Sequence, residues 1–184
     1  MLLLAHVGIT LGIARSIKKL MDYREPKKIH EWIDYRLVIL GSMLPDIIDK
    51  PLGGIIFKET IGNGRIYSHT LLFLLFLSAL GAFVWAKYRR SGLLVVAGGN
   101  IVHHILDSMW VHPETFLWPI YGWTFTKGDP EHWLQLWANL LIYPKYYIPE
   151  ILGGIIIIIF ITELVISKNL YYFIVNGRVK SGIT

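Results

Sequence analysis

Long apolar blocks without charge are the feature that most constrains how this chain can fold. The stretch from Thr70 to Ala86 contains no charged residue, and residues 151–161 are aliphatic apart from a glycine pair and a phenylalanine. Segments of about 17–25 such residues are long enough to cross the hydrocarbon core of a membrane. Lipid offers the backbone no hydrogen-bonding partner, so only helices and closed barrels span it, and these blocks lack the alternation of barrel strands. The sequence therefore predicts an all-α membrane protein.

The apolar blocks repeat along the chain and predict a polytopic helix bundle. We expect about four to five membrane segments, within residues 2–20, 37–49, 69–86, 92–110 and 148–167. Charged residues make up 17% of the chain, against about 25% in a soluble domain. Residues 1–184 are therefore expected to form a single integral membrane domain.

Several of these segments contain small or helix-breaking residues. The second segment is short and includes Gly41, Pro45 and Asp46, so we expect a broken or re-entrant helix there. Glycine pairs at 53–54, 98–99 and 153–154 are expected to let helices pack closely, because small residues favour close packing in lipid.

The longest connection, residues 111–147, is rich in aromatic side chains. It contains Trp118, Tyr121, Trp123, Trp133 and Trp137. Tryptophan and tyrosine favour the level of the lipid headgroups. We therefore expect this connection to lie along the membrane surface as an interfacial loop.

Basic residues are distributed unevenly between the connections. Thirteen of the 18 Lys and Arg residues lie between Arg15 at the end of the first segment and Arg36, after the third segment, or in the C-terminal tail. Cytoplasmic loops carry an excess of such residues, which places the N-terminus outside and the C-terminus in the cytoplasm. This orientation accounts for the net charge of +5, so no nucleic-acid partner is expected. The chain has no cysteine, which excludes disulfides and thiolate metal ligands.

Ionisable residues inside membrane segments are costly and mark functional sites. In the predicted topology, four segments bring such residues toward the outer leaflet: His6, Asp46, Asp49, His69, His103 and Asp107. Mixed imidazole and carboxylate ligands suit a divalent ion, Zn in the first place and otherwise Mn or Fe. The alternative for each residue alone is a buried polar group that is hydrogen-bonded to a neighbouring helix.

Spacing supports a shared ion. His103 and Asp107 are four residues apart, which places both on one helix face, and Asp46 and Asp49 are three apart. His104 points about 100° away from His103, so only one of the two histidines is expected to be a ligand. We expect His103 to be the ligand, because it is four residues from Asp107 and therefore lies on the same helix face.

Two further residues are candidates for roles beside the ion. Arg65 precedes His69 on the same outer side, where it would either bind an anionic group of a substrate or pair with an aspartate. Glu114 follows the fourth segment and is a candidate general base, but its position favours a place in an interfacial turn.

Four sequence pieces occur in order over residues 1–120. They are His6, Gly41-Ser-Met-Leu-Pro-Asp46 continuing to Asp49, Arg65-x-x-Ser68-His69-Thr70, and His103-x-x-x-Asp107. With these pieces the chain resembles the YdjM-type family of membrane-bound, metal-dependent hydrolases, the LexA-regulated inner-membrane protein family. The resemblance implies hydrolase activity and names no substrate. Two positions depart from the family pattern: Gly64 stands where the family often has His, and one extra residue separates Asp46 from Asp49.

These observations lead to one expected function and one alternative class. The expectation is a metal-dependent hydrolase at the extracytoplasmic membrane surface, acting on a lipid phosphoester. The alternative is a non-enzymatic membrane protein in which the same residues form a structural metal site or an ion pathway. The cytoplasmic half of the fifth segment offers only Thr162 and Glu163 as polar residues, which disfavours a pathway.

Overall fold

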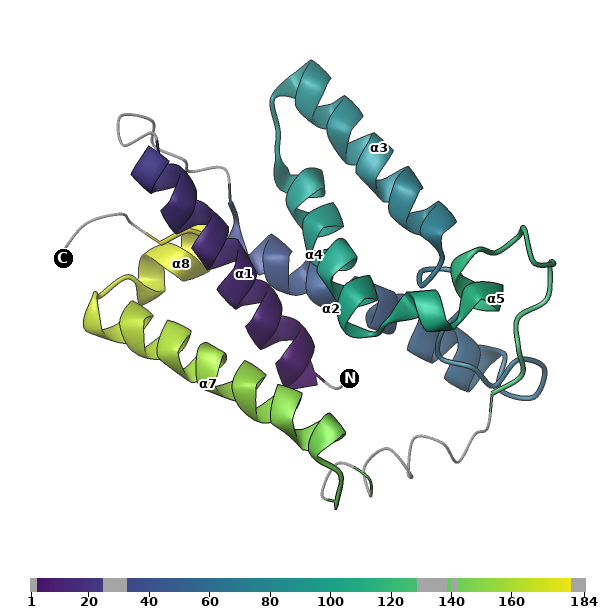
Figure 1. Cartoon of the computed structure of the whole chain (residues 1–184). Coiled ribbons are helices and arrows are strands. Elements are labelled where there is room, and N and C mark those ends of the chain that lie inside the picture. Colours follow the sequence, from purple (N-terminus) through teal and green to yellow (C-terminus); the bar gives the residue numbers. More distant parts are fainter. Residues whose placement is uncertain (1–2, 25–32, 129–138, 140–141, 180–184) are drawn as a thin grey trace.

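The computed structural model describes residues 3–24, 33–128, 139 and 142–179. These residues form helices and turns and contain no strand, which confirms the all-α fold class (Figure 1). The helices are α1 (Leu3–Arg24), α2 (Tyr35–Pro51), the π-helical turn η1 (Leu52–Ile56), α3 (Leu71–Tyr88), α4 (Gly92–Leu106), the 3-10 turn η2 (Met109–Val111), α5 (Pro113–Phe116), α7 (Pro144–Ile166) and α8 (Leu170–Asn176).

The two central helices of the bundle are α2 and α4, which pack against each other and against α1. Outside them, α7 lies along α1 on one flank and α3 lies along α4 on the other (Figure 1). The main core cluster joins Leu11 of α1, Val38 of α2, Val95 of α4 and Phe160 of α7. Four of the five long helices therefore share one apolar centre.

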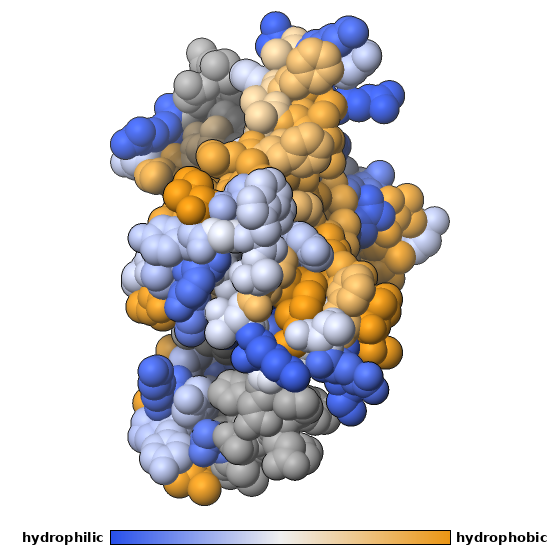
Figure 2. Space-filling model, turned by 90° about the vertical axis from the view of Figure 1, so that its right-hand side faces the viewer, coloured by the Kyte–Doolittle hydropathy of each residue, from blue (hydrophilic) through white to orange (hydrophobic). Residues whose placement is uncertain are grey.

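The two flanking helices are those that could span a membrane. Both α3 and α7 are long and apolar enough, by length and composition, to cross it. Only 11% of the most apolar stretch of α3 and 17% of that of α7 is buried in the protein, so most of their apolar side chains face outward. Figure 2 shows an apolar area in the upper half of one face, bordered by hydrophilic residues above and below. The α4 helix is apolar but has only 15 residues, and the count of four to five spans stays a prediction.

The second segment differs from the expected broken helix. The α2 helix runs without interruption from Tyr35 to Pro51, with Pro45 in its interior, and the irregular turn η1 follows it. Pro45 has no N–H to donate to the carbonyl of Gly41, and its own carbonyl also accepts a bond from the Ser68 hydroxyl at 3.0 Å.

Glycine permits the close approach of the two central helices. A Cβ atom on Gly99 of α4 would lie 2.8–2.9 Å from backbone atoms of α2, whereas one on Gly98 would meet nothing within 4 Å. The pairs at 53–54 and 153–154 behave alike, since Gly53 and Gly153 abut backbone and their partners Gly54 and Gly154 do not. One glycine of each pair is thus a packing residue.

We expect Gly99→Ala to destabilise the bundle and Gly98→Ala to leave it equally or more stable. The added methyl of Gly99→Ala must push two backbones apart, which typically costs about 1–3 kcal/mol. Gly98→Ala adds a better helix former in open space. Thermal unfolding in detergent micelles checks this, and equal melting temperatures for the two variants would contradict the packing described.

The predicted interfacial loop, residues 111–147, is described only in part, and its described residues do not test a contact with the membrane. Trp118 stacks on Phe125 with ring centroids 5.6 Å apart, and Tyr67 meets both rings edge to face. Trp123 is 77% exposed. Trp133 and Trp137 lie outside the described residues. The interfacial loop therefore remains a prediction.

Candidate metal centre

The structure brings the six predicted polar residues to one end of the bundle. His6 lies in the first turns of α1, Asp46 and Asp49 near the end of α2, His69 just before α3, and His103 and Asp107 at the end of α4. Thr70 caps α3 by accepting the Phe73 N–H at 3.1 Å, which fixes the helix start beside His69. Each of the six side chains is at least 93% buried.

Five of the six contribute atoms to two overlapping groups. One group comprises His6, Asp46 and His103, and the other comprises His69, His103 and Asp107. Within each group the possible ligand atoms lie within 4.8 Å of one another. His103 belongs to both groups, so it is the centre of the cluster.

The facing nitrogens of His69 and His103 are the most informative pair. The Nδ1 atom of His103 lies 2.7 Å from the Ser42 carbonyl, and Nδ1 of His69 lies 2.7 Å from an Asp49 oxygen. A carbonyl and a carboxylate only accept, so both Nδ1 atoms must donate, and a neutral ring then has an unprotonated Nε2. The two Nε2 atoms lie 3.2 Å apart. Two lone pairs at that distance repel unless a cation or a proton lies between them.

His6 completes the histidine cluster. Its ring stacks on that of His103 with centroids 4.1 Å apart. Its Nε2 lies 3.2 Å from Asp107 Oδ1 but is not aligned for a hydrogen bond, and among the described residues neither ring nitrogen has a hydrogen-bond partner. A buried imidazole with both nitrogens unsatisfied is costly, so this geometry suits a ring that binds an ion.

In two of the aspartates, one carboxylate oxygen binds a cationic side chain and the other faces a histidine ring. Lys50 binds Asp46 Oδ2 at 2.7 Å, while Oδ1 lies 3.7 Å from His69 Nε2. Arg65 binds Asp107 Oδ2 through Nε at 2.9 Å and Nη2 at 2.8 Å, while Oδ1 faces His6. Both cations are partly exposed, whereas both carboxylates are buried. Of the two roles expected for Arg65, the structure shows the pairing with an aspartate.

Asp49 has a different environment from the other two aspartates. Its oxygens accept the backbone N–H groups of Ile66, Ser68 and His69 at 2.8–3.1 Å, in addition to Nδ1 of His69. It belongs to neither ligand group. A carboxylate that receives the N–H of a histidine fixes the orientation of that ring, as it does beside many metal ions. The geometry therefore points to Asp49 as the residue that orients His69.

Comparison with known protein families shows which family this chain belongs to. The family description "YdjM inner membrane protein" matches residues 1–172, nearly the whole sequence. The chain belongs to the YdjM inner membrane protein family. Neither a curated protein nor a solved structure matches it. Membership of the YdjM family confirms the resemblance carried by the four sequence pieces, and it places the protein in a membrane.

Two other candidate residues of this YdjM family member belong to neither ligand group. His104 is buried, directs Nδ1 to the Asn100 carbonyl at 2.8 Å, and belongs to neither ligand group. Its ring centroid lies 6.1 Å from those of His69 and His103, and its Nε2 has no hydrogen-bond partner among the described residues. The choice of His103 over its neighbour stays a prediction. Glu114 is exposed in α5 and also belongs to neither group.

Sequence reasoning overlooked two buried polar residues of this YdjM protein. Glu150 of α7 accepts the N–H groups of Leu4 and Ala5 at 3.0 and 3.3 Å, and so caps the helix that carries His6. The amide atoms of Asn100, one turn before His103, find no hydrogen-bond partner in the described part of the chain. Both residues interrupt otherwise apolar segments, which was the signal available in the sequence.

Proposed function

We propose that this YdjM family member is a metal-dependent hydrolase that acts at the membrane surface. The metal ligands in this proposal are drawn from His6, Asp46, His69, His103 and Asp107. Asp49 orients His69 from behind. The ion is Zn²⁺ in the first place, with Mn²⁺ or Fe²⁺ as the other choices for mixed nitrogen and oxygen ligands.

The pair of facing Nε2 atoms is the observation that carries the proposal. Two nitrogens bound to one tetrahedral zinc ion at about 2.0–2.1 Å lie about 3.4 Å apart. The distance between His69 and His103 is 3.2 Å, close to that value. The competing explanation is a proton shared between the two rings. A shared proton accounts for that pair alone, whereas an ion would also give a role to the ring of His6, whose nitrogens form no hydrogen bond with the described residues.

A divalent ion at this place would supply an activated water and polarise the bond to be cleaved. The protein residues then have distinct tasks. Ser42 and Asp49 hold the two imidazoles in one tautomer through their Nδ1 atoms. Lys50 and Arg65 each hold one oxygen of an aspartate, so that the other oxygen stays directed at the histidines.

The same two cations favour an anionic substrate. The Lys50 and Arg65 side chains are 55% and 36% exposed, next to buried carboxylates whose charge they partly offset. An approaching phosphoester would meet these positive groups before it reaches the cluster. A lipid phosphoester is therefore the substrate class we propose, within reach of a protein that is itself in the membrane.

Turnover tests this proposal. Purified protein in mixed micelles is incubated with a phospholipid, a soluble phosphodiester and a carboxylic ester, before and after removal of metal by a chelator. We expect release of product from the phospholipid, a loss of at least about 100-fold on chelation, and recovery with added metal. Absence of turnover of all three by the metal-loaded protein would leave the structural metal site as the better account.

The orientation of the chain is part of the proposal, because it places the cluster on the extracytoplasmic side. It rests on the distribution of thirteen basic residues among three connections. Single cysteines are clean probes in a chain that has none. Thr126→Cys should react with an impermeant thiol reagent on intact cells, and Tyr23→Cys should react only after lysis. The reversed pattern would place the cluster in the cytoplasm.

A further inference from the structure

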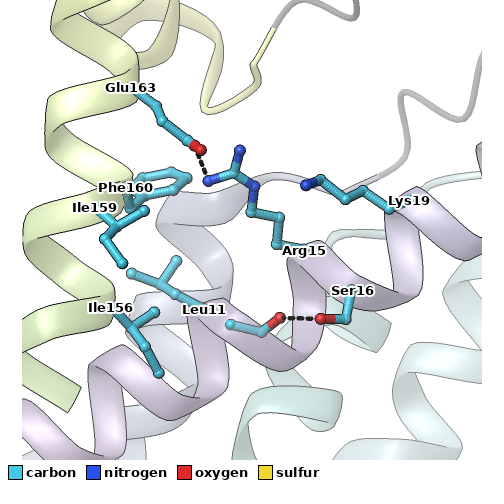
Figure 3. Close-up of a pocket in the computed structure, with 9 residues that line it drawn as sticks. Leu11, Arg15, Ser16, Lys19, Ile156, Ile159, Phe160 and Glu163 are labelled. Carbon is cyan, nitrogen blue, oxygen red and sulfur yellow. Dashed lines mark hydrogen bonds and ion pairs between the residues drawn. The ribbon is translucent and has the colours of Figure 1, made fainter. Parts of the chain in front are cut away.

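A groove between α1 and α7 lies well away from the metal cluster. It has a volume of about 260 Å³. Figure 3 shows its polar end at Arg15 and Lys19 of α1 and Glu163 of α7. Arg15 is nine residues beyond His6, roughly 14 Å along the helix, so the groove is separate from the proposed active site.

The groove changes character along its length. Its floor is formed by Leu11 and Phe160, two buried members of the main core. Ile156 and Ile159 line its side on α7, a helix long and apolar enough to span the membrane. Ile156 lies seven residues, roughly 10 Å, from Glu163, so the apolar wall leads from the charged end toward the middle of α7.

The charges at the polar end favour an anion. Arg15 forms an ion pair with Glu163, and its side chain is 30% exposed. Lys19 lines the same groove one turn further along α1 and adds a second positive charge to this end (Figure 3). One carboxylate against two cations leaves this end net positive. Basic pockets between membrane helices bind anionic lipid headgroups.

We propose that this groove binds one anionic phospholipid. The phosphate lies at Arg15 and Lys19, and an acyl chain lies along Ile156 and Ile159. Glu163 competes with the phosphate for Arg15, because both are anions that can accept from the same guanidinium. A binding role for the groove does not depend on the metal centre or on its activity.

The experiment compares lipid retention by native mass spectrometry on the purified full-length protein. Its probes are phosphatidylglycerol and phosphatidylcholine with identical acyl chains. We expect the wild-type protein to prefer phosphatidylglycerol by at least about fivefold. Lys19→Gln should lower the affinity for phosphatidylglycerol by about fivefold, the effect of about 1 kcal/mol per basic residue.

Two variants that break the same ion pair should act in opposite directions. Arg15→Gln should weaken binding of phosphatidylglycerol, and Glu163→Gln should strengthen it, because the competing carboxylate is gone. Lys87→Gln is the control, since Lys87 lies at the end of α3 over Phe83 and Tyr88. Equal retention of the two lipids would overturn the proposal. So would equal weakening by Arg15→Gln and Glu163→Gln, or a chain dimer that fills the groove without lipid preference.

Discussion

His103→Ala is expected to remove the metal from the purified protein almost completely. His103 is the one residue shared by both ligand groups, and its Nε2 faces that of His69 at 3.2 Å. Loss of a shared ligand leaves each group with two of its three members. We expect metal content per chain to fall by at least about tenfold, as measured by elemental analysis after gel filtration, since changes to residues that merely orient ligands already cost about 10–100-fold in affinity.

His104→Ala is the matched control for that substitution. Both histidines are buried on α4, and both variants leave a similar space, but His104 belongs to neither ligand group. The His104→Ala protein should therefore retain as much metal as the wild-type protein. If the two variants lose metal equally, the loss reflects damage to α4, and the assignment of His103 as a ligand fails.

Asp49→Asn is expected to be the most destabilising isosteric change near the cluster. The carboxylate accepts three backbone N–H groups and the Nδ1 of His69, all in a fully buried place. An amide keeps one accepting oxygen and turns an NH₂ group toward the remaining donors. Each buried donor left without an acceptor costs about 1–3 kcal/mol. We expect a loss of about 3 kcal/mol or more, which lowers the melting temperature by roughly 10 °C.

The same variant separates an orienting residue from a ligand. If Asp49 only orients His69, Asp49→Asn should weaken metal binding by about 10–100-fold, so excess metal restores full occupancy. Asp22→Asn is the stability control, because Asp22 pairs with Lys18 near the surface, where such pairs contribute about 0–1 kcal/mol. An Asp49→Asn protein as stable as Asp22→Asn would contradict the hydrogen-bonding role described for Asp49.

Much of the fold follows from the distribution of charge and hydropathy alone. The five apolar segments correspond to α1, α2, α3, α4 and α7, because uncharged blocks of that length have few other structures available in lipid. The continuity of α2 did not follow. Pro45 disfavours a regular helix at this position because it removes one backbone hydrogen bond, yet the α2 helix runs through it from Tyr35 to Pro51.

For the candidate site, too, one part could be predicted from the sequence and another part could not. The grouping of histidines and aspartates follows from counting which end of each segment carries them. The separate tasks of Asp46 and Asp49 do not follow, because two aspartates three residues apart look alike in the sequence. They differ in what the fold places beside them: Lys50 one turn further along α2 for Asp46, and the backbone of residues 66–69 for Asp49. The role of Arg65 depends likewise on Asp107, which is 42 residues away.

X-ray absorption spectroscopy of the wild-type protein, purified without chelators, tests the metal centre most directly. The proposed function predicts a stoichiometric transition metal with nitrogen and oxygen ligands, at about 2.0–2.1 Å if the metal is zinc. The spectrum should also contain the outer-shell scattering of at least two imidazole rings, from His69 and His103. A protein without stoichiometric metal, or an ion surrounded by oxygen ligands alone, would contradict it and would favour a proton shared between the two rings.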